Sequence, residues 1–275
     1  MNGQNAGRHF TKFSSLSFSY QCVFNCRLNT ARIIQAFLPA ASPQESDFYM
    51  SELNVDPKFS IFGLLARRES ITGAIHHRRT MSAISHEIEN ATILDHANTT
   101  IFAGFQYMSK FLRQEERYRK LAREAKRVYV FGVVNCPLPG IDNVVYVPLE
   151  PTDQLTKEWF LISYGERYYS ALATEELTHI NDPDDKRIFK GIWTFQQPLV
   201  AILHDWLADS VGMRRLNYDG IRHDMQSQFH IMNTTMERLN KRILKHGSDD
   251  LGTELRHIVS KDLLPTIWEL QSTTQ

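Results

Sequence analysis

The chain has 275 residues, of which 42% are hydrophobic and 23% charged, which is typical of a globular protein with one large or two small domains. Its 31 basic and 31 acidic residues give no net charge, which argues against a nucleic-acid-binding protein because such proteins carry a basic excess. No apolar run approaches the roughly 18 residues of a membrane span, and the three cysteines have neither disulfide-framework nor zinc-ligand spacing, so we expect a cytoplasmic protein that binds no membrane.

The first 44 residues contain no Asp or Glu and combine arginines and serines with aromatic residues. This composition is typical of an organellar transit peptide. The alternative is a misassigned translation start, because Met50 opens a segment of ordinary mixed composition; we favour it for the family resemblance described below. Under either interpretation we expect residues 1–49 to be a poorly ordered extension outside the folded core.

Residues 50–213 alternate between helical and strand patterns. Apolar residues at spacings of three and four predict helices over 60–68, 80–94, 106–125 and 197–212. Short apolar runs rich in β-branched and aromatic residues predict strands over 99–105, 127–134, 144–149, 159–165, 168–176 and 189–195. We therefore predict an α/β domain, with α+β as the alternative, in which helices flank a mixed sheet of about five to six strands.

Residues 214–275 are predicted to form a separate helical segment. Helices are expected over 221–245 and 250–264, and Pro265 is expected to end or kink the second one. The first helix carries an apolar stripe at alternating spacings of four and three, which is typical of a coiled-coil seam: Met225, Phe229, Met232, Met236, Leu239 and Ile243. The stripe predicts a homodimer. The alternative is a helical hairpin, in which apolar residues of the second helix (Leu251, Leu255 and Ile258) cover the stripe within one chain.

The stretch Ser85-His86-Glu87-Ile88 is similar to the start of the phosphoacceptor sequence of sensor histidine kinases. Helical periodicity places His86 opposite the apolar stripe of the 80–94 helix, so we expect its side chain to be exposed. The Thr-Pro pair that continues the kinase sequence is replaced by Glu89-Asn90, and no Gly-rich nucleotide-binding sequence follows. We therefore interpret His86 as a solvated surface residue and not as a nucleophile.

No P-loop, dinucleotide fingerprint, hydrolase elbow or metalloprotease helix occurs, so we predict no catalytic residue and no metal site, and the sequence identifies no cofactor. The densest polar cluster is His76-His77-Arg78-Arg79. Its guanidinium groups could clamp a carboxylate or a phosphate, whereas the alternative is a solvated cationic helix start. If the domain binds an anion, we expect His77, Arg78 and Arg79 to hold it, with Trp193 as an apolar wall.

A second polar cluster combines Glu175-Glu176 with His179, Asp182, Asp184 and Asp185. Its oxygen atoms could bind a cation, but the spacing has no EF-hand register. We interpret this cluster as a solvated acidic loop.

Four successive segments resemble the DICT sensory domain family: HHRRTMSAISHEIE, TIFAGFQYMSKFLRQEERYRKLAREAKRVYVFGV, VYVPLEPTDQLTKEWFLISYGERYYSALATEE and FKGIWTFQQPLVAILHDWL. The resemblance covers residues 59–211. The family is named for its occurrence with diguanylate cyclases and two-component systems, chiefly in cyanobacteria and haloarchaea, and is proposed to take part in light or stress responses. The resemblance implies a sensory or regulatory role in signal transduction, a bacterial cytoplasm and a signalling protein as partner. It implies no particular ligand.

The chain departs from the usual architecture of that family, because no cyclase, kinase or receiver domain follows residue 213. We therefore expect a stand-alone, non-enzymatic sensory module that acts through contacts of its C-terminal helices. The alternatives are a small-molecule enzyme whose site is assembled from dispersed residues, and a structural dimerisation protein.

Overall fold

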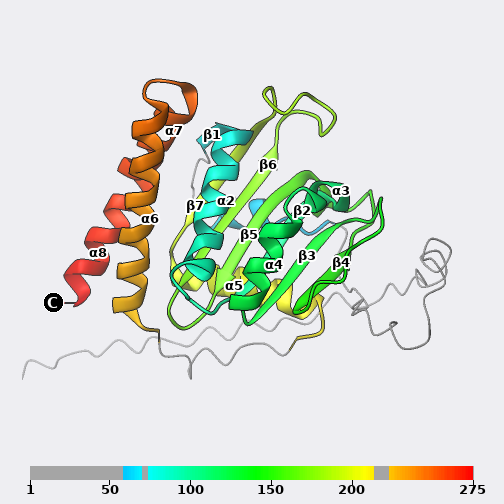
Figure 1. The fold of residues 1–275 in the computed structure, drawn as a ribbon, viewed down its shortest axis with the longest axis horizontal. Helices are drawn as coiled ribbons and strands as arrows, with labels where there is room; N and C mark the ends of the chain where they lie inside the picture. The colour runs from blue at the N-terminus through cyan, green and yellow to red at the C-terminus, as the bar shows by residue number, and fades with distance from the viewer. Residues whose placement is uncertain (1–57, 70–73, 214–222, 275) are drawn as a thin grey trace, which may run out of the picture. The chain divides into compact units, whose positions relative to one another are not determined.

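The computed structural model describes residues 58–69, 74–213 and 223–274, so the expectation for residues 1–49 lies outside the described part. The described residues form a seven-stranded sheet in the order β1-β7-β6-β5-β2-β3-β4 (Figure 1). Pairing is parallel among β2, β3 and β4 and antiparallel elsewhere. The predicted mixed sheet flanked by helices is confirmed, with slightly more strands than expected.

The strands follow the predicted runs closely, apart from the first one. They are β1 (Ala74–His77), β2 (Thr100–Tyr107), β3 (Arg127–Val133), β4 (Val144–Pro148), β5 (Glu158–Tyr164), β6 (Tyr169–Glu176) and β7 (Ile188–Thr194). β3 is buried on both faces, as its continuous β-branched and aromatic composition indicates. The strand β1 was not predicted, because four residues with two histidines carry no strand pattern.

Helices cover both faces of the sheet. In Figure 1, α2 (Arg78–Ile93) and α4 (Glu115–Glu124) lie on the near face, while α5 (Gln197–Ser210) lies behind it. The helix α1 (Ile61–Glu69) and the 3-10 turn η2 (Gln154–Lys157) share the apolar core of α5. Alternate strand residues feed the two cores, so that Ile101 packs toward α2 and Phe102 toward α5.

The predicted helix over 106–125 is wrong at its start and in its middle. Gln106 and Tyr107 continue β2, and the helical part is divided into α3 (Met108–Leu112) and α4. The pairing of β2 with β3 shifts register between Gly104 and Tyr107, and Gln106 has a φ of 60°. Such a bulge re-aims the chain and depends on the neighbouring strand, so the helical periodicity of the following residues gave no sign of it.

The C-terminal helices are α6 (Met225–His246), α7 (Asp250–Ile258), the π-helical turn η4 (Val259–Leu263) and α8 (Leu264–Thr274). Gly247, with a φ of 62°, ends α6, and the Oδ1 of Asp249 caps α7 by accepting from the N–H of Gly252 at 2.8 Å. Pro265 does not end the helical segment: the π-helical turn η4 lies directly before Leu264 and Pro265, and α8 continues beyond them to Thr274. Within the described ranges, the helices are too short or too polar to cross a lipid bilayer.

The apolar stripe of α6 packs inside the chain. The stripe residues Met232, Leu239 and Ile243 are buried in the same core as the three apolar residues of α7, Leu251, Leu255 and Ile258. The other three stripe residues, Met225, Phe229 and Met236, are partly buried against that core. This is the hairpin arrangement that the sequence left as the alternative to a dimer seam. Self-association stays a prediction.

Candidate functional site

A hollow lies beside α2, bounded by the bulge of β2, by α3 and by the residue that precedes β7. We refer to it as the cationic hollow, because four of its lining side chains are the cations Arg78, Lys110, Arg113 and Arg187. Its other polar and aromatic residues include Ser85, His86 and Trp159. The four cations come from α2, α3, the turn after α3 and the loop before β7, so the fold and not a local motif brings them together.

At the rear of the hollow, the side chains of Arg187, Glu176 and Gln106 are hydrogen-bonded to one another. The Arg187 side chain is almost fully buried, and its Nε and Nη2 donate to the two carboxylate oxygens of Glu176, at 2.7 Å each. Nη2 also donates to the Oε1 of Gln106 at 2.8 Å, and the Nε2 of Gln106 donates to Glu176 at 2.9 Å. The strained backbone of Gln106 is therefore held in place by its own side chain, and Glu176 neutralises Arg187.

The prediction of a solvated acidic loop is wrong for Glu176, whose side chain is only 4% exposed. The neutralising arginine follows it by 11 residues, across a turn that periodicity analysis does not resolve.

The front of the hollow is a looser cluster around the carboxylate of Asp184. This carboxylate lies 3.4 Å from the Nε of Arg78, 3.6 Å from the Nη1 of Arg113 and 3.8 Å from the Nη1 of Arg187. The Nε of Arg78 is buried without a hydrogen-bond partner in the described part of the chain. Its guanidinium lies 5.9 Å from the centroid of the Trp159 ring. Burial lowers the pKa of Arg78, and the charge of Asp184 opposes that shift.

Two further polar groups of the hollow lack a direct partner. Lys110 forms no ion pair with the carboxylates that the structure describes; burial and the nearby guanidinium of Arg187 lower its pKa. Ser85 is 5% exposed, and its hydroxyl has no hydrogen-bond partner among the described atoms. Buried polar atoms are normally hydrogen-bonded, so an unpaired one at a hollow indicates where a ligand atom can bind.

His86 is half-buried at the rim of the hollow, so the prediction of an exposed side chain is wrong. Burial lowers its pKa, which keeps the imidazole largely neutral at pH 7. The helical periodicity of α2 correctly identified the face on the sheet. It could not show that α4 covers another face, where the Nη2 of Arg117 donates to the carbonyl oxygen of His86 at 2.8 Å.

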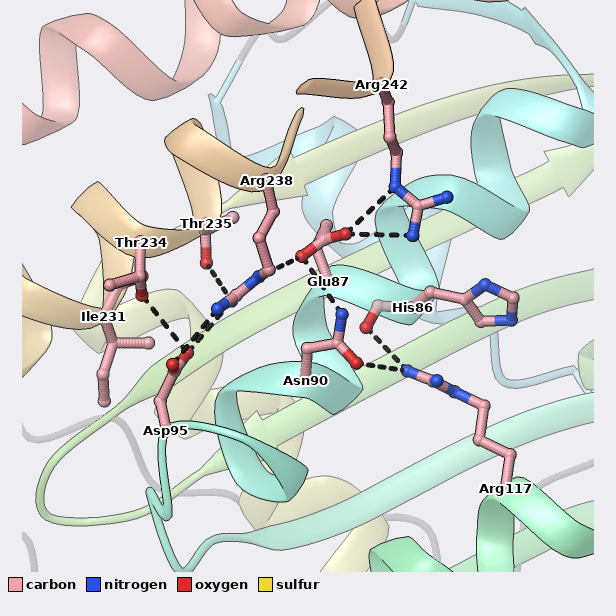
Figure 2. Close-up of polar contacts among 10 residues, drawn as sticks. All are labelled: His86, Glu87, Asn90, Asp95, Arg117, Ile231, Thr234, Thr235, Arg238 and Arg242. Carbon is pink, nitrogen blue, oxygen red and sulfur yellow. Dashed lines mark hydrogen bonds and ion pairs between the residues drawn. The ribbon is translucent and has the colours of Figure 1, made fainter. Parts of the chain in front are cut away.

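A polar network joins α2 to α4 and α6 (Figure 2). The fully buried carboxylate of Glu87 accepts from the Nε of Arg238 at 2.5 Å and from the Nε of Arg242 at 3.1 Å, both on α6. Arg238 also donates to Asp95 at 2.9 and 3.1 Å. The Nδ2 of Asn90 donates to Glu87 at 3.3 Å, one helical turn along α2.

The same network reaches the cationic hollow. The Nη2 of Arg117 donates to the Oδ1 of Asn90 at 2.9 Å, and its Nε donates to the carboxylate of Glu89. Glu89 and His86 line the hollow. A continuous series of hydrogen bonds therefore runs from the lining of the hollow, through Arg117 and Asn90, to Glu87 and α6. We refer to this series as the interhelical network.

The structure places the four predicted anion-binding residues in different surroundings. Arg78 lines the cationic hollow, whereas Arg79 is exposed and does not line it. The Nδ1 of His77 contacts the carboxylate of Glu254 on α7 at 2.5 Å, which ties the end of β1 to the C-terminal helices. Trp193 lines a second hollow, between β7 and the C-terminal helices, and its Nε1 donates to the Oγ of Ser170 at 2.8 Å. Anion binding by any of the four stays a prediction.

Lys110, Arg113 and Arg187 were not predicted to be neighbours of Arg78. Lys110 and Arg113 stand on the polar side of a predicted amphipathic helix, where a cation is ordinary. The one available signal of this cluster was the short spacing between Asp184 and Arg187, because an acidic and a basic residue close together in a loop indicate local charge pairing. In the part of the chain that the structure describes, no three His, Cys, Asp or Glu side chains are grouped to hold a metal ion.

The fold and the hollow describe a sheet domain with a cation-lined hollow on one face and a helical layer packed beside it. Residues 65–177 match the DICT family, whose description is "Sensory domain in DIguanylate Cyclases and Two-component system". This part of the chain is therefore a DICT sensory domain, and the resemblance stated from the sequence is confirmed over these residues. No curated protein matches the chain.

Proposed function

We propose that the chain is a sensory module of signal transduction that binds a small molecule in the cationic hollow. The molecule acts on α2, and the interhelical network passes its effect to α6, α7 and α8. These helices contact a signalling protein, and that contact is the output. The module is non-enzymatic in this proposal, because, among the described residues that line the hollow, the Ser85 hydroxyl makes no hydrogen bond to a base that could activate it.

The position of α2 carries this proposal. One side of the helix lines the hollow through Ser85, His86 and Glu89. Another side holds α6 through the buried carboxylate of Glu87. A ligand that shifts α2 must therefore strain the contacts with α6, since bidentate and buried ion pairs tolerate little change in geometry.

The test begins with the purified full chain, incubated with a metabolite extract of bacterial cells and separated by ultrafiltration. Mass spectrometry identifies the retained molecule, and hydrogen exchange then follows the backbone amides of α6, α7 and α8 with and without it. We expect the retained molecule to change amide protection in α6. Glu87→Gln should bind the molecule with similar affinity but show a smaller change in α6.

Three outcomes would contradict the proposal. Chemical conversion of the retained molecule by the chain would favour the small-molecule enzyme. If the chain retains no molecule and the extract does not change hydrogen exchange in α6, a structural protein is favoured. Binding that leaves α6 unchanged in the wild-type chain would show that α2 does not carry the signal.

A further inference from the structure

The charges of the cationic hollow do not balance. Arg187 is neutralised by Glu176, and Glu89 is neutralised by Arg117 of the interhelical network. Three cations then remain, Arg78, Lys110 and Arg113, and the carboxylate of Asp184 is the acidic group that faces them within the described chain. Several cations gathered around one carboxylate attract a further anion.

Asp184 is held weakly compared with the other carboxylates of this region. It lies in a turn closed by a hydrogen bond from the N–H of Lys186 to the carbonyl oxygen of Pro183, at 2.8 Å. Its side chain is 44% exposed, and its contacts with Arg78 and Arg113 are 3.4 and 3.6 Å long. Charge-assisted hydrogen bonds between nitrogen and oxygen are normally about 2.7–2.9 Å long, so these contacts are loose ion pairs. The 2.7 Å bonds of Glu176 to Arg187, a few residues away, show the tighter geometry.

We propose that the cationic hollow binds the phosphate or carboxylate group of a small molecule at Arg78, Lys110 and Arg113, and that Asp184 competes with this group for the two arginines. The inference rests on the proposed function, since it names the chemical class of the molecule that the sensory module detects. Entry of the anion displaces the Asp184 carboxylate and moves the turn between β6 and β7. Asp184 thereby sets the concentration at which the module responds.

The other lining groups fit such a ligand. The hydroxyl of Ser85 makes no hydrogen bond in the described chain and can donate to an anionic oxygen. The Nε of Arg78, which has a loose ion pair but no hydrogen bond, can do the same. The ring of Trp159 lies beside Arg78 and offers a flat apolar surface to the rest of the molecule. Guanidinium groups prefer planar or tetrahedral oxyanions over halides, because the oxygen spacing matches their N–H groups.

The experiment titrates the full chain with inorganic phosphate and, separately, with citrate as a carboxylate probe, by isothermal calorimetry at constant ionic strength. We expect Asp184→Asn to bind the preferred probe about tenfold more tightly, because the competing carboxylate is removed. Asp185→Asn is the matched control, since it removes the same charge from the same exposed turn. It should change the affinity by less than about twofold, because no ion pair joins Asp185 to the described cations.

Arg78→Gln should weaken binding about tenfold or more through the loss of a charge-assisted hydrogen bond, with exposed Arg79→Gln as its control. Lys110→Gln is a second variant, should Arg78→Gln fail to fold. Comparison of the phosphate titration with the citrate titration shows whether the hollow prefers a phosphate or a carboxylate group. Equal affinities of Asp184→Asn and Asp185→Asn would overturn the competition, and equal affinities of the Arg78, Lys110 and Arg79 variants would overturn the site.

These failures are distinguishable from failure of the proposed function. Tight anion binding without any change in α6 exchange would refute the signalling path but leave the anion site in place. An uncharged molecule that binds the hollow and changes α6, in a chain that binds neither probe, would refute the anion site alone.

Discussion

Replacement of Glu87 by Gln tests the interhelical network through protein stability. The substitution keeps the shape of the side chain, removes its charge and places an NH2 group where arginine donors converge. In the wild-type chain the carboxylate is 1% exposed and faces Arg238, which is 20% exposed, and Arg242, which is 38% exposed. Breaking a fully buried ion pair by removing one partner costs about 3–5 kcal/mol.

The cost should be smaller here for two structural reasons. Arg238 keeps Asp95 as a partner, at 2.9 and 3.1 Å, and the guanidinium of Arg242 can turn toward water. We therefore expect Glu87→Gln to lower the free energy of unfolding by about 2–3 kcal/mol, measured by urea denaturation with linear extrapolation. In a double-mutant cycle, Glu87→Gln and Arg242→Gln should show a coupling energy of about 1–2 kcal/mol.

The control is an exposed ion pair on the same domain. Glu115 and Arg119 pair across one turn of α4, with side chains 35% and 43% exposed. Glu115→Gln should cost no more than about 0.5 kcal/mol, because solvent screens the pair. If Glu87→Gln costs no more than this control, or if the cycle shows no coupling, the network does not hold α6 to α2 and the proposed signalling path loses its basis.

Two further measurements test other parts of the fold. Burial raises the pKa of Glu158 to about 7 from 4.5, while its Oε2 accepts from the N–H groups of Ile61 and Phe62. The folded carboxyl thus binds its proton more tightly than the unfolded one, so its stabilising effect is full below pH 4.5 and is lost as the pH rises through about 7. Relative to Glu158→Gln, the wild-type chain should lose about 3 kcal/mol of stability between pH 4.5 and 8, and parallel pH profiles of the two proteins would contradict this. Leu239→Ala should lower the free energy of unfolding by about 2–5 kcal/mol, because Leu239 is buried within the chain. For the same reason, the molecular mass measured by light scattering should be the same for the variant and the wild-type chain. A wild-type chain with the mass of a dimer and a variant with the mass of a monomer would instead support the coiled-coil prediction.

The helices and strands that pack directly on the apolar core could be predicted from the sequence. The runs of β3 and β5 are apolar because both faces of the sheet are covered, and that requirement is visible in the residues themselves. The helices α6 and α7 were visible in the same way, from apolar residues at helical spacing on either side of Gly247, but the hairpin that they form was only the alternative to a dimer seam. Local composition carries this information because burial on the core selects the residue types directly.

Polar contacts between one helix and another, on faces that point away from the sheet, left no comparable signal in the sequence. Glu87 stands on a face of α2 that does not touch the sheet, so its helical position predicts a solvated carboxylate. It is instead fully buried, because α6 supplies Arg238 and Arg242 from 151 and 155 residues further along the chain. The cationic hollow was missed for the same reason. Arg78 was identified from its own cluster, whereas Lys110, Arg113 and Arg187 become its neighbours only when β2 bulges and β7 returns beside it.

The two kinds of contact also differ in what they can transmit. Apolar side chains of α2 on the sheet can slide by a fraction of an ångström at little cost, because dispersion forces have no preferred direction. Arg238 of α6 cannot follow such a shift freely, since its N–H groups must stay aligned with the oxygens of Glu87 and Asp95. A displacement of α2 must therefore either carry α6 with it or break buried ion pairs. Because breaking them is the more costly choice, α2 and α6 should move as one unit, and that unit extends from the rim of the cationic hollow to the C-terminal helices.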